Sequence, residues 1–521
     1  MRSLWEAAVN LRGSIEPADY KRYVLPLIFL RFLSLRFEKR RKELDTLMHD
    51  PSSDYYTTDS EVAKDILNDE DEYRAAGAFV VPEEARWSNI VKIAQADDLK
   101  IRLDRILELL EKTYPNELRG LLPRIYAGSN LDRDNLAGLI NLFSRDVFTY
   151  DHGGEDIIGR VYEYFIGEFA NSEGKRGGEY FTPASIVKVL VAMLEPTEGV
   201  VYDPCCGSGG MFVQSDSFTH HSGELSFVGQ ESKDFTYRLC RMNLFIHGIN
   251  GNIKLGNTYV DDKHAAMKAD YVIANPPFND GSKSEAGWGA DKVPDKDARL
   301  SIPGSKHRFT LSPRNANTMW ILHFLHHLAA GGRAGFVMAT GELSSMHTAR
   351  LEVRQALVER NHVDCIVQLT GQLFANTQIP CSLWFLSKGR DGSSGERERN
   401  GEVLFIDGRH LGTLIPGSRK QKQLSPDEIE KIAAAYRKFR TSGTPEEQPG
   451  FCKVATLDEI AEHRFVLTPG RYVGAYNGDE EDEPFKERMP ELLSKLKQHF
   501  EESDRLQAAI AESLQEFGYG E

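Results

Sequence analysis

Residues 199–210 read GVVYDPCCGSGG, an apolar run that passes directly into a glycine-rich turn. A strand, a turn of this kind and then a helix are typical of the nucleoside-binding edge of an open α/β sheet, where glycine lets the backbone approach a ligand closely. Candidates for binding a cofactor are therefore Asp203, Gly207, Ser208, Gly209 and Gly210. A tight turn without a ligand explains the same glycines, so this interpretation needs support from other residues.

Support comes from Glu231, which ends the next apolar run, residues 227–231. It follows the glycines by about twenty residues, the spacing at which a carboxylate can accept both ribose hydroxyls of a nucleotide cofactor. A solvated glutamate at a strand end is the alternative.

The sharpest signal is Asn275-Pro276-Pro277-Phe278, directly after an apolar run at 271–274. Two prolines stiffen the loop and remove two N–H donors, which leaves carbonyls free to point into a cleft. The Asn275 side-chain oxygen and the Pro276 carbonyl could then accept both hydrogens of an exocyclic amine, while Phe278 offers a stacking face. Such contacts free the nitrogen lone pair to attack a methyl group, so positioning and electrostatics supply most of the catalysis. The alternative is a stiffened loop with a core phenylalanine.

Short apolar runs alternate with helical patterns around these motifs, which predicts an α/β fold with a doubly wound, mostly parallel, seven-stranded Rossmann-like sheet. The predicted strands are residues 199–203, 225–229, 252–255, 270–274, 333–338, 364–368 and 381–386. Apolar residues at three- and four-residue steps predict an all-helical N-terminal domain and a C-terminal helical extension. We predict four parts: a helical domain at 1–172, the catalytic domain at 173–390, a mixed extension at 391–478 and a docking helix at 479–521.

Composition limits the possible classes of protein. The 521 residues are 27% charged and 40% hydrophobic, which excludes collagen-like, disordered and multi-pass membrane chains. We expect a cytoplasmic protein, because residues 24–37 are too short to cross a bilayer and no signal peptide is evident. Six scattered cysteines without CxxC spacing argue against structural zinc or a disulfide framework. A net charge of −15 implies that the chain would need a partner to bind DNA.

A long polar segment follows the Asn275 loop. Between residues 298 and 315 it contains Arg299, Lys306, Arg308 and Arg314 and no acidic residue. We hypothesise that these four residues contact DNA phosphates, with a solvated linker as the alternative. Farther on, His323, His326 and His327 have ligand-like spacing but no evident carboxylate or fourth ligand, so no metal site is predicted.

The order of GEYFTP (178–183), DPCCGSGG, the strand-end glutamate, GNT (256–258) and NPPF resembles N6-adenine DNA methyltransferases that use S-adenosylmethionine. More closely, the chain resembles the DNA methylase (M) subunit of type I restriction-modification systems. Residues 4–13, 20–32 and 467–474 extend the likeness over nearly the whole chain. Cys205-Cys206 departs from the family, in which small residues such as alanine are common there.

The resemblance implies roles for individual residues. Cofactor binding would fall to Glu179, Tyr180, Phe181, Thr182, Pro183 and Ala184, with Ser208, Gly209 and Gly210 on the other side. Glu231 would bind the ribose and Asn257 the adenine. Thr182 is a good N-cap and Pro183 a good first helical residue, so a helix N-terminus would point at the methionine carboxylate.

The resemblance also implies partners: double-stranded DNA, a specificity (S) subunit that reads the DNA sequence, a second methylase subunit, and the restriction (R) motor-nuclease subunit. No GxxxxGK[ST] motif is present, so the motor activity belongs elsewhere. Pro204-Cys205 and Pro380-Cys381 do not fit the nucleophilic cysteine of cytosine-C5 methylases, because no Glu-Asn-Val companion exists. Two alternatives stay open: a protein-glutamine N5-methyltransferase, and a catalytically silent clamp that binds cofactor only to assemble a complex.

Overall fold

The structure is a computed structural model and describes residues 2–13, 15–145, 157–172, 181–279, 281, 288–303, 307–374, 378–392, 395–416, 418, 420–443, 447–474 and 485–516. The chain divides into two compact units, residues 1–473 and 474–521. Each unit is described by itself.

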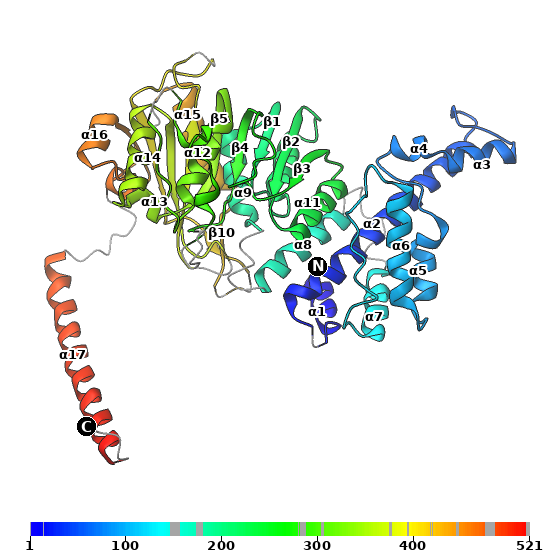
Figure 1. The fold of residues 1–521 in the computed structure, drawn as a ribbon, viewed down its shortest axis with the longest axis horizontal. Coiled ribbons are helices and arrows are strands. Elements are labelled where there is room, and N and C mark those ends of the chain that lie inside the picture. The colour runs from blue at the N-terminus through cyan, green and yellow to red at the C-terminus, as the bar shows by residue number, and fades with distance from the viewer. Residues whose placement is uncertain are drawn as a thin grey trace. The chain divides into compact units, whose positions relative to one another are not determined.

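A twisted central sheet organises the first unit (Figure 1). Its strands, in spatial order, are β11 (Cys452–Thr456), β8 (Glu402–Gly408), β6 (Val363–Leu369), β7 (Cys381–Ser387), β5 (Leu328–Ala339), β4 (Ala269–Ala274), β1 (Gly199–Asp203), β2 (Leu225–Glu231) and β3 (Gly251–Leu255). Strand β7 runs antiparallel to β5 and β6, and β11 runs antiparallel to β8, while the remaining pairs are parallel.

The predicted doubly wound fold is confirmed, and all seven predicted strands are present. The predicted strand number is too low, because β8 and β11 from the segment 391–478 extend the same sheet. The strand order reverses at β1, which pairs with β2 on one side and with β4 on the other. Ligands of open α/β sheets bind at such a reversal, beyond the carboxyl ends of the strands.

Helices cover both faces of the sheet. One apolar core lies under α9 (Ala184–Leu194), α10 (Gly210–Phe218), part of α11 (Asp234–Ile246) and α15 (Pro426–Thr441). The opposite core lies under α12 (Asn317–His327), α13 (Gly341–Ser344), α14 (Thr348–Glu359) and α16 (Leu457–Glu462). Single-turn helices η4 (Ala290–Lys292), η5 (Ala298–Leu300) and η6 (Pro469–Arg471) and the small pair β9 (Thr413–Leu414) and β10 (Lys422–Gln423) complete this part.

The chain before the sheet is helical, as predicted. It forms α1 (Arg2–Asn10), α2 (Pro17–His49), α3 (Ser60–Asn68), α4 (Glu70–Arg74), η1 (Glu83–Ala85), α5 (Trp87–Ile93), α6 (Leu99–Thr113), α7 (Arg133–Phe143) and α8 (Ile157–Ser172). A third core packs around α2 and includes Leu239, Met242 and Ile246 of α11. These α11 side chains attach the helical part to the sheet. None of the helices that the structure describes is long and apolar enough to cross a membrane.

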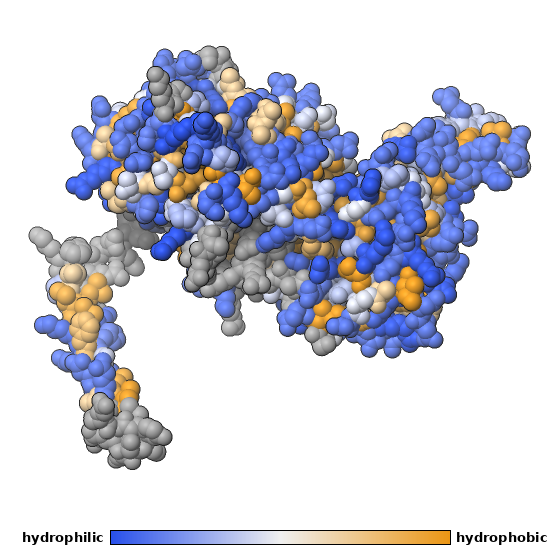
Figure 2. Space-filling model, viewed as in Figure 1, coloured by the Kyte–Doolittle hydropathy of each residue, from blue (hydrophilic) through white to orange (hydrophobic). Residues whose placement is uncertain are grey.

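The second unit contains α17 (Phe485–Glu516). Its apolar side chains are exposed along the helix (Figure 2), among them Leu493, Leu496 and Phe500.

Candidate functional site

Most of the described residues predicted to bind the cofactor gather beyond the carboxyl ends of β1, β2 and β4, whereas Ala184 lines a separate hollow. A cavity of about 230 Å³ is lined there by Pro204, Cys205, Glu231, Ser232, Lys233, Asn257, Thr258, Tyr259, Pro277 and Trp320. A hollow of about 20 Å³ adjoins it and is lined by Phe181, Thr182, Asp203, Cys205, Cys206, Gly207, Ser208, Gly210, Met211 and Asn275. Cys205 lines both. A wider hollow of about 770 Å³ contains Gly199 and Asp270, at the opposite ends of β1 and β4. Because ligands of open α/β sheets bind beyond the carboxyl ends of the strands, the strand order favours the two adjoining cavities of about 230 and 20 Å³ as the ligand site.

The glycine turn adopts the backbone that its sequence predicts. Gly207 and Gly209 have φ of 54° and 81°, in the left-handed region that favours glycine. Glu231, which is 7% exposed, braces this turn, because its carboxylate accepts the N–H of Gly207 at 3.1 Å and that of Lys233 at 2.8 Å. Burial raises the pKa of the Glu231 carboxyl. A carboxylate has about four lone-pair directions, so Glu231 retains acceptor capacity for a ligand hydroxyl.

Asp203 lies beneath the turn. It is fully buried, and its carboxylate accepts the N–H of Cys205 at 3.0 Å. Burial raises the pKa of Asp203 to about 7, against a hydrogen bond from Cys205 that lowers it. Asp203 therefore changes charge near neutral pH, beside the hollow that Asn275 lines.

The orientation of the Asn275 amide is set by a residue from another motif. Its Nδ2 donates to the Thr182 hydroxyl at 3.0 Å, which joins the NPPF loop to the FTP motif. Its Oδ1 is buried, and among the described residues it has no hydrogen-bond partner. A buried acceptor without a donor costs about 1–3 kcal/mol, which an incoming N–H group would recover.

The same bond corrects the role predicted for Thr182. The N-cap of α9 is Pro183, with φ −54° and ψ 133°, and no side chain caps the helix. Ala184 is the first helical residue. The Thr182 hydroxyl accepts from Asn275 instead of from the helix backbone. Glu179 and Tyr180 lie outside the described residues.

An aromatic residue that the sequence did not single out lies against Phe278. The ring of Phe374 packs edge-on, with centroids 6.4 Å apart and an interplanar angle of 83°. Phe374 follows the end of β6, whose carboxyl end lies on the same edge of the sheet as that of β4. An aromatic residue shortly after a parallel strand is the signal that could have identified it.

The basic segment separates into different environments. Arg308 and Arg314 are exposed, although Arg308 also donates to the carbonyls of Asp295 and Asp297 at 3.0 Å each. Lys306 lies outside the described residues. Arg299 does not fit the predicted contact with DNA phosphates, because it is 5% exposed and its guanidinium bonds to Asp297, Thr258 and Tyr259.

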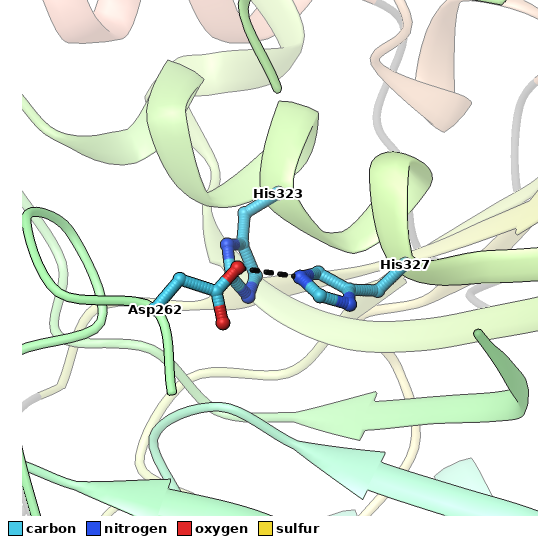
Figure 3. A group of neighbouring side chains, drawn as sticks. All are labelled: Asp262, His323 and His327. Atoms are coloured by element: carbon cyan, nitrogen blue, oxygen red, sulfur yellow. Dashed lines mark hydrogen bonds and ion pairs between the residues drawn. The ribbon is translucent and has the colours of Figure 1, made fainter. Parts of the chain in front are cut away.

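The histidine cluster contains a carboxylate that the sequence did not reveal. His323 and His327 lie one turn apart on α12, and Asp262 Oδ2 lies 2.9 Å from His327 Nε2 (Figure 3). The three groups could surround a cation, since their ligand atoms lie within 4.8 Å of one another. His326 is not part of this group.

The hydrogen bonds of the cluster disfavour a metal ion. Arg299 Nη1 lies 3.3 Å from His323 Nδ1, and a guanidinium only donates, so Nδ1 accepts and Nε2 carries the proton. That proton faces the Tyr202 hydroxyl at 3.1 Å, and His327 Nδ1 faces the Met267 carbonyl at 3.0 Å. His323 thus offers no free lone pair, and the adjacent guanidinium repels a cation. The cluster is a buried hydrogen-bond network beside the cofactor-site candidate.

Comparisons with known proteins agree with this geometry. Residues 153–481 match the N-6 DNA methylase family, and residues 1–143 match the HsdM N-terminal domain. The type I restriction enzyme MjaIX methylase subunit of Methanocaldococcus jannaschii is 42% identical over 523 residues, which cover 99% of this chain and 91% of that protein. The type I restriction enzyme HindI methylase subunit of Haemophilus influenzae is 40% identical and covers 80% of this chain and 92% of that protein.

Solved structures share the fold. The type I restriction-modification methyltransferase subunit of Streptococcus thermophilus superposes with a TM-score of 0.72 at 24% identity, over 91% of this chain and 99% of that one.

Proposed function

Since the chain belongs to the N-6 DNA methylase family, among the methylase subunits of type I restriction enzymes as its motifs predict, we propose how its residues methylate the N6 amine of adenine in DNA. The observation that carries the proposal is the unpartnered Asn275 Oδ1 at the edge of the sheet. The amine of an adenine turned out of the duplex would supply the missing donor.

The residues present fit S-adenosylmethionine, which supplies an activated methyl group when bound. The adenosyl part would lie in the cavity of about 230 Å³, with the ribose at Glu231 and the base near Asn257. The methionine part would lie along Asp203 and the turn Gly207, Ser208, Gly209 and Gly210, opposite Phe181 and Thr182, where the hollow of about 20 Å³ would widen to admit it. We propose that Glu179, Tyr180, Pro183 and Ala184 of the same motif also contribute to cofactor binding. The carboxylate of Asp203 suits a cationic ammonium group.

The NPPF loop would act by accepting hydrogen bonds. Asn275 Oδ1 and the Pro276 carbonyl would each accept a hydrogen bond from one N–H of the amine, and Pro277 would keep the loop rigid. The Pro276 acceptor belongs to the backbone of the proline-stiffened loop, and the Asn275 amide is held by its hydrogen bond to Thr182. They stabilise the positive charge that develops on the nitrogen, which is the contribution expected of preorganised dipoles. No strong general base is needed.

Phe278 and Phe374 would hold the target base. Phe278 is partly exposed and would offer the stacking face, and Phe374, which is 8% exposed, packs edge-on against it and would hold its ring in place. Stacking of a base on an aromatic ring is worth about 1–3 kcal/mol, enough to offset part of the cost of unstacking it from DNA.

The other parts of the chain would serve the complex. We assign residues 1–172 to a helical domain, 173–390 to the methyltransferase domain, 391–478 to its extension and 479–521 to docking. Arg308, Arg314 and Lys306 would contact DNA phosphates. The exposed apolar side chains of α17 suit a helical partner, for which we propose the specificity subunit. A second methylase subunit and the restriction subunit would complete the assembly.

Labelled S-adenosylmethionine tests the proposal. Label should enter the N6 position of adenine in duplex DNA when the specificity subunit is present. Label in the glutamine side chain of a release-factor protein would indicate the glutamine N5-methyltransferase instead. Cofactor binding without transfer to either substrate would indicate a silent clamp.

A further inference from the structure

Arg299 is not among the residues that line the proposed cofactor cavity, but it bonds to two that are, Thr258 and Tyr259. We propose that Arg299 is a positioning residue for the cofactor, which acts by holding the backbone of Thr258 and Tyr259. The inference rests on the proposed function in one respect, since it takes the cavity to be the cofactor site.

The guanidinium of Arg299 bonds to two separate segments of chain. Its Nη1 donates to the Thr258 carbonyl and its Nη2 to the Tyr259 carbonyl, both at 2.8 Å. On the other side, Nε and Nη2 donate to the Asp297 carboxylate at 3.0 and 2.6 Å. Burial opposes ionisation of Asp297, but the hydrogen bonds from Arg299 lower the pKa of that carboxyl. Arg299 is therefore a buried, charge-assisted clamp.

The two carbonyls belong to residues that line the cavity. Thr258 and Tyr259 are 5% and 6% exposed, so their carbonyls have little access to water if Arg299 is lost. The Thr258 hydroxyl donates to the Pro204 carbonyl at 2.6 Å, which connects the same backbone to the glycine turn. Movement of this backbone would therefore displace two walls of the cavity together.

Arg299 also contacts the helix that forms a third wall. Its Nη1 lies 3.3 Å from His323 on α12, one turn from Trp320. Trp320 packs against Tyr259 with ring centroids 4.7 Å apart. Its Nε1 is buried and has no acceptor within the part of the chain that the structure describes. A ring nitrogen of a purine could accept a hydrogen bond from Trp320 Nε1. Because Trp320 packs against Tyr259, we expect the binding of such a base to depend on the position of Tyr259.

Lysine cannot replace this arrangement. An ammonium has a single nitrogen, whereas the planar guanidinium reaches carbonyls and a carboxylate in different directions. Arg299→Lys retains the charge and most of the volume but leaves at least one buried carbonyl without a donor. The loss of such a bond corresponds to about a tenfold change in an equilibrium constant.

Arg354 provides a matched control. It is also buried, and it donates to the carbonyls of Glu342, Ser345 and Phe465 at 2.8, 2.9 and 2.6 Å. It does not line the cavity. Arg354→Lys should therefore lower the melting temperature of the protein without changing its Kd for the cofactor.

The test is calorimetric titration of the full chain with S-adenosylmethionine, which needs no methyl transfer. For Arg299→Lys we expect the cofactor Kd to rise by roughly tenfold, whereas Arg354→Lys should stay within about twofold of wild type. In the complex with DNA, Arg299→Lys should raise KM for the cofactor and leave kcat within about threefold. A folded Arg299→Lys protein with wild-type cofactor Kd would overturn the inference.

A second variant covers the case in which Arg299→Lys does not fold. Asp297→Asn keeps a neutral acceptor and should raise the cofactor Kd in the same direction by a smaller factor, and an unchanged Kd would count against the clamp. If wild-type protein binds cofactor but never methylates DNA, the proposed function fails while these Kd comparisons still decide the role of Arg299.

Discussion

Replacement of Asn275 by alanine tests the central geometry. The variant removes Oδ1, one of two proposed acceptors for the target amine, and leaves the Pro276 carbonyl in place. Loss of one preorganised contact to a developing charge costs about 10²–10³ in kcat, or roughly 2.7–4 kcal/mol. Thr182, which loses the donor at 3.0 Å, is only half-buried, so its hydroxyl can turn to water. We therefore expect a stability loss of about 1 kcal/mol or less.

Asn275→Asp makes the prediction sharper. A carboxylate keeps a side-chain acceptor in the same place, and the Thr182 hydroxyl can rotate to donate to it. We expect this variant to lose roughly tenfold in kcat, clearly less than alanine. The comparison of Asn275→Asp with Asn275→Ala thus distinguishes the effect of losing a hydrogen-bond acceptor from the effect of losing side-chain volume.

Single-turnover methyl transfer into DNA, with the specificity subunit present, measures the chemical step apart from product release. Cofactor Kd should stay within about threefold of wild type in both variants, because Oδ1 is proposed to bind the target amine and not the cofactor. If Asn275→Ala transfers methyl groups within about threefold of the wild-type rate, the acceptor role of Oδ1 is refuted.

Three further changes address other parts of the site. Because the folded-state pKa of Asp203 is about 7, above its ordinary 3.8, its contribution to the free energy of unfolding is fully present below pH 3.8 and is lost as pH rises through about 7. Asp203→Asn should remove that slope, measured by melting temperature between about pH 5 and pH 8, and an unaltered slope would assign it to another group. Phe374→Leu keeps apolar packing but loses the ring that packs edge-on against Phe278, so KM for DNA should rise by about tenfold with cofactor Kd unchanged, and an unaltered KM would exclude a role of Phe374 in holding the base. Arg308→Ala with Arg314→Ala should reduce the slope of log binding constant against log salt by about 2, and an unchanged slope would exclude phosphate contacts.

Much of the fold follows from local sequence, because buried parallel strands are short apolar runs with turn residues at their ends. Strand β11 escaped this criterion since Cys452–Thr456 is only partly buried and lies in a polar region. Strand β8 does meet the criterion, because Val403–Ile406 is a buried apolar run. It was missed because the predicted sheet ended before the polar segment that precedes this run. Site residues at strand ends were predictable for the same reason, because parallel strands bring their carboxyl ends to one edge.

Side-chain partners were harder to predict than positions. The N-cap preference of threonine is worth about 1 kcal/mol, and a tertiary bond between Thr182 and Asn275 outweighed it. Arg299 was grouped with exposed basic residues although Asp297, two positions earlier, is its partner. The basic segment was counted from residue 298, so the count left out the carboxylate of Asp297. The spacing Asp-x-Arg was the signal in the sequence that Arg299 pairs with a residue of its own chain.

Unpartnered buried atoms locate this site only when cavity and topology agree with them. Tyr162 and Trp384 also carry buried polar atoms without a described partner, yet both lie inside apolar cores. Asn275 and Trp320 differ because each lines a hollow at the edge where the strand order reverses. The groups behind them, such as Arg299, are instead saturated with protein partners. Rigid, satisfied residues behind unsatisfied ones are what a preorganised site requires, since free energy spent on ordering the protein is then not spent again when the ligand binds.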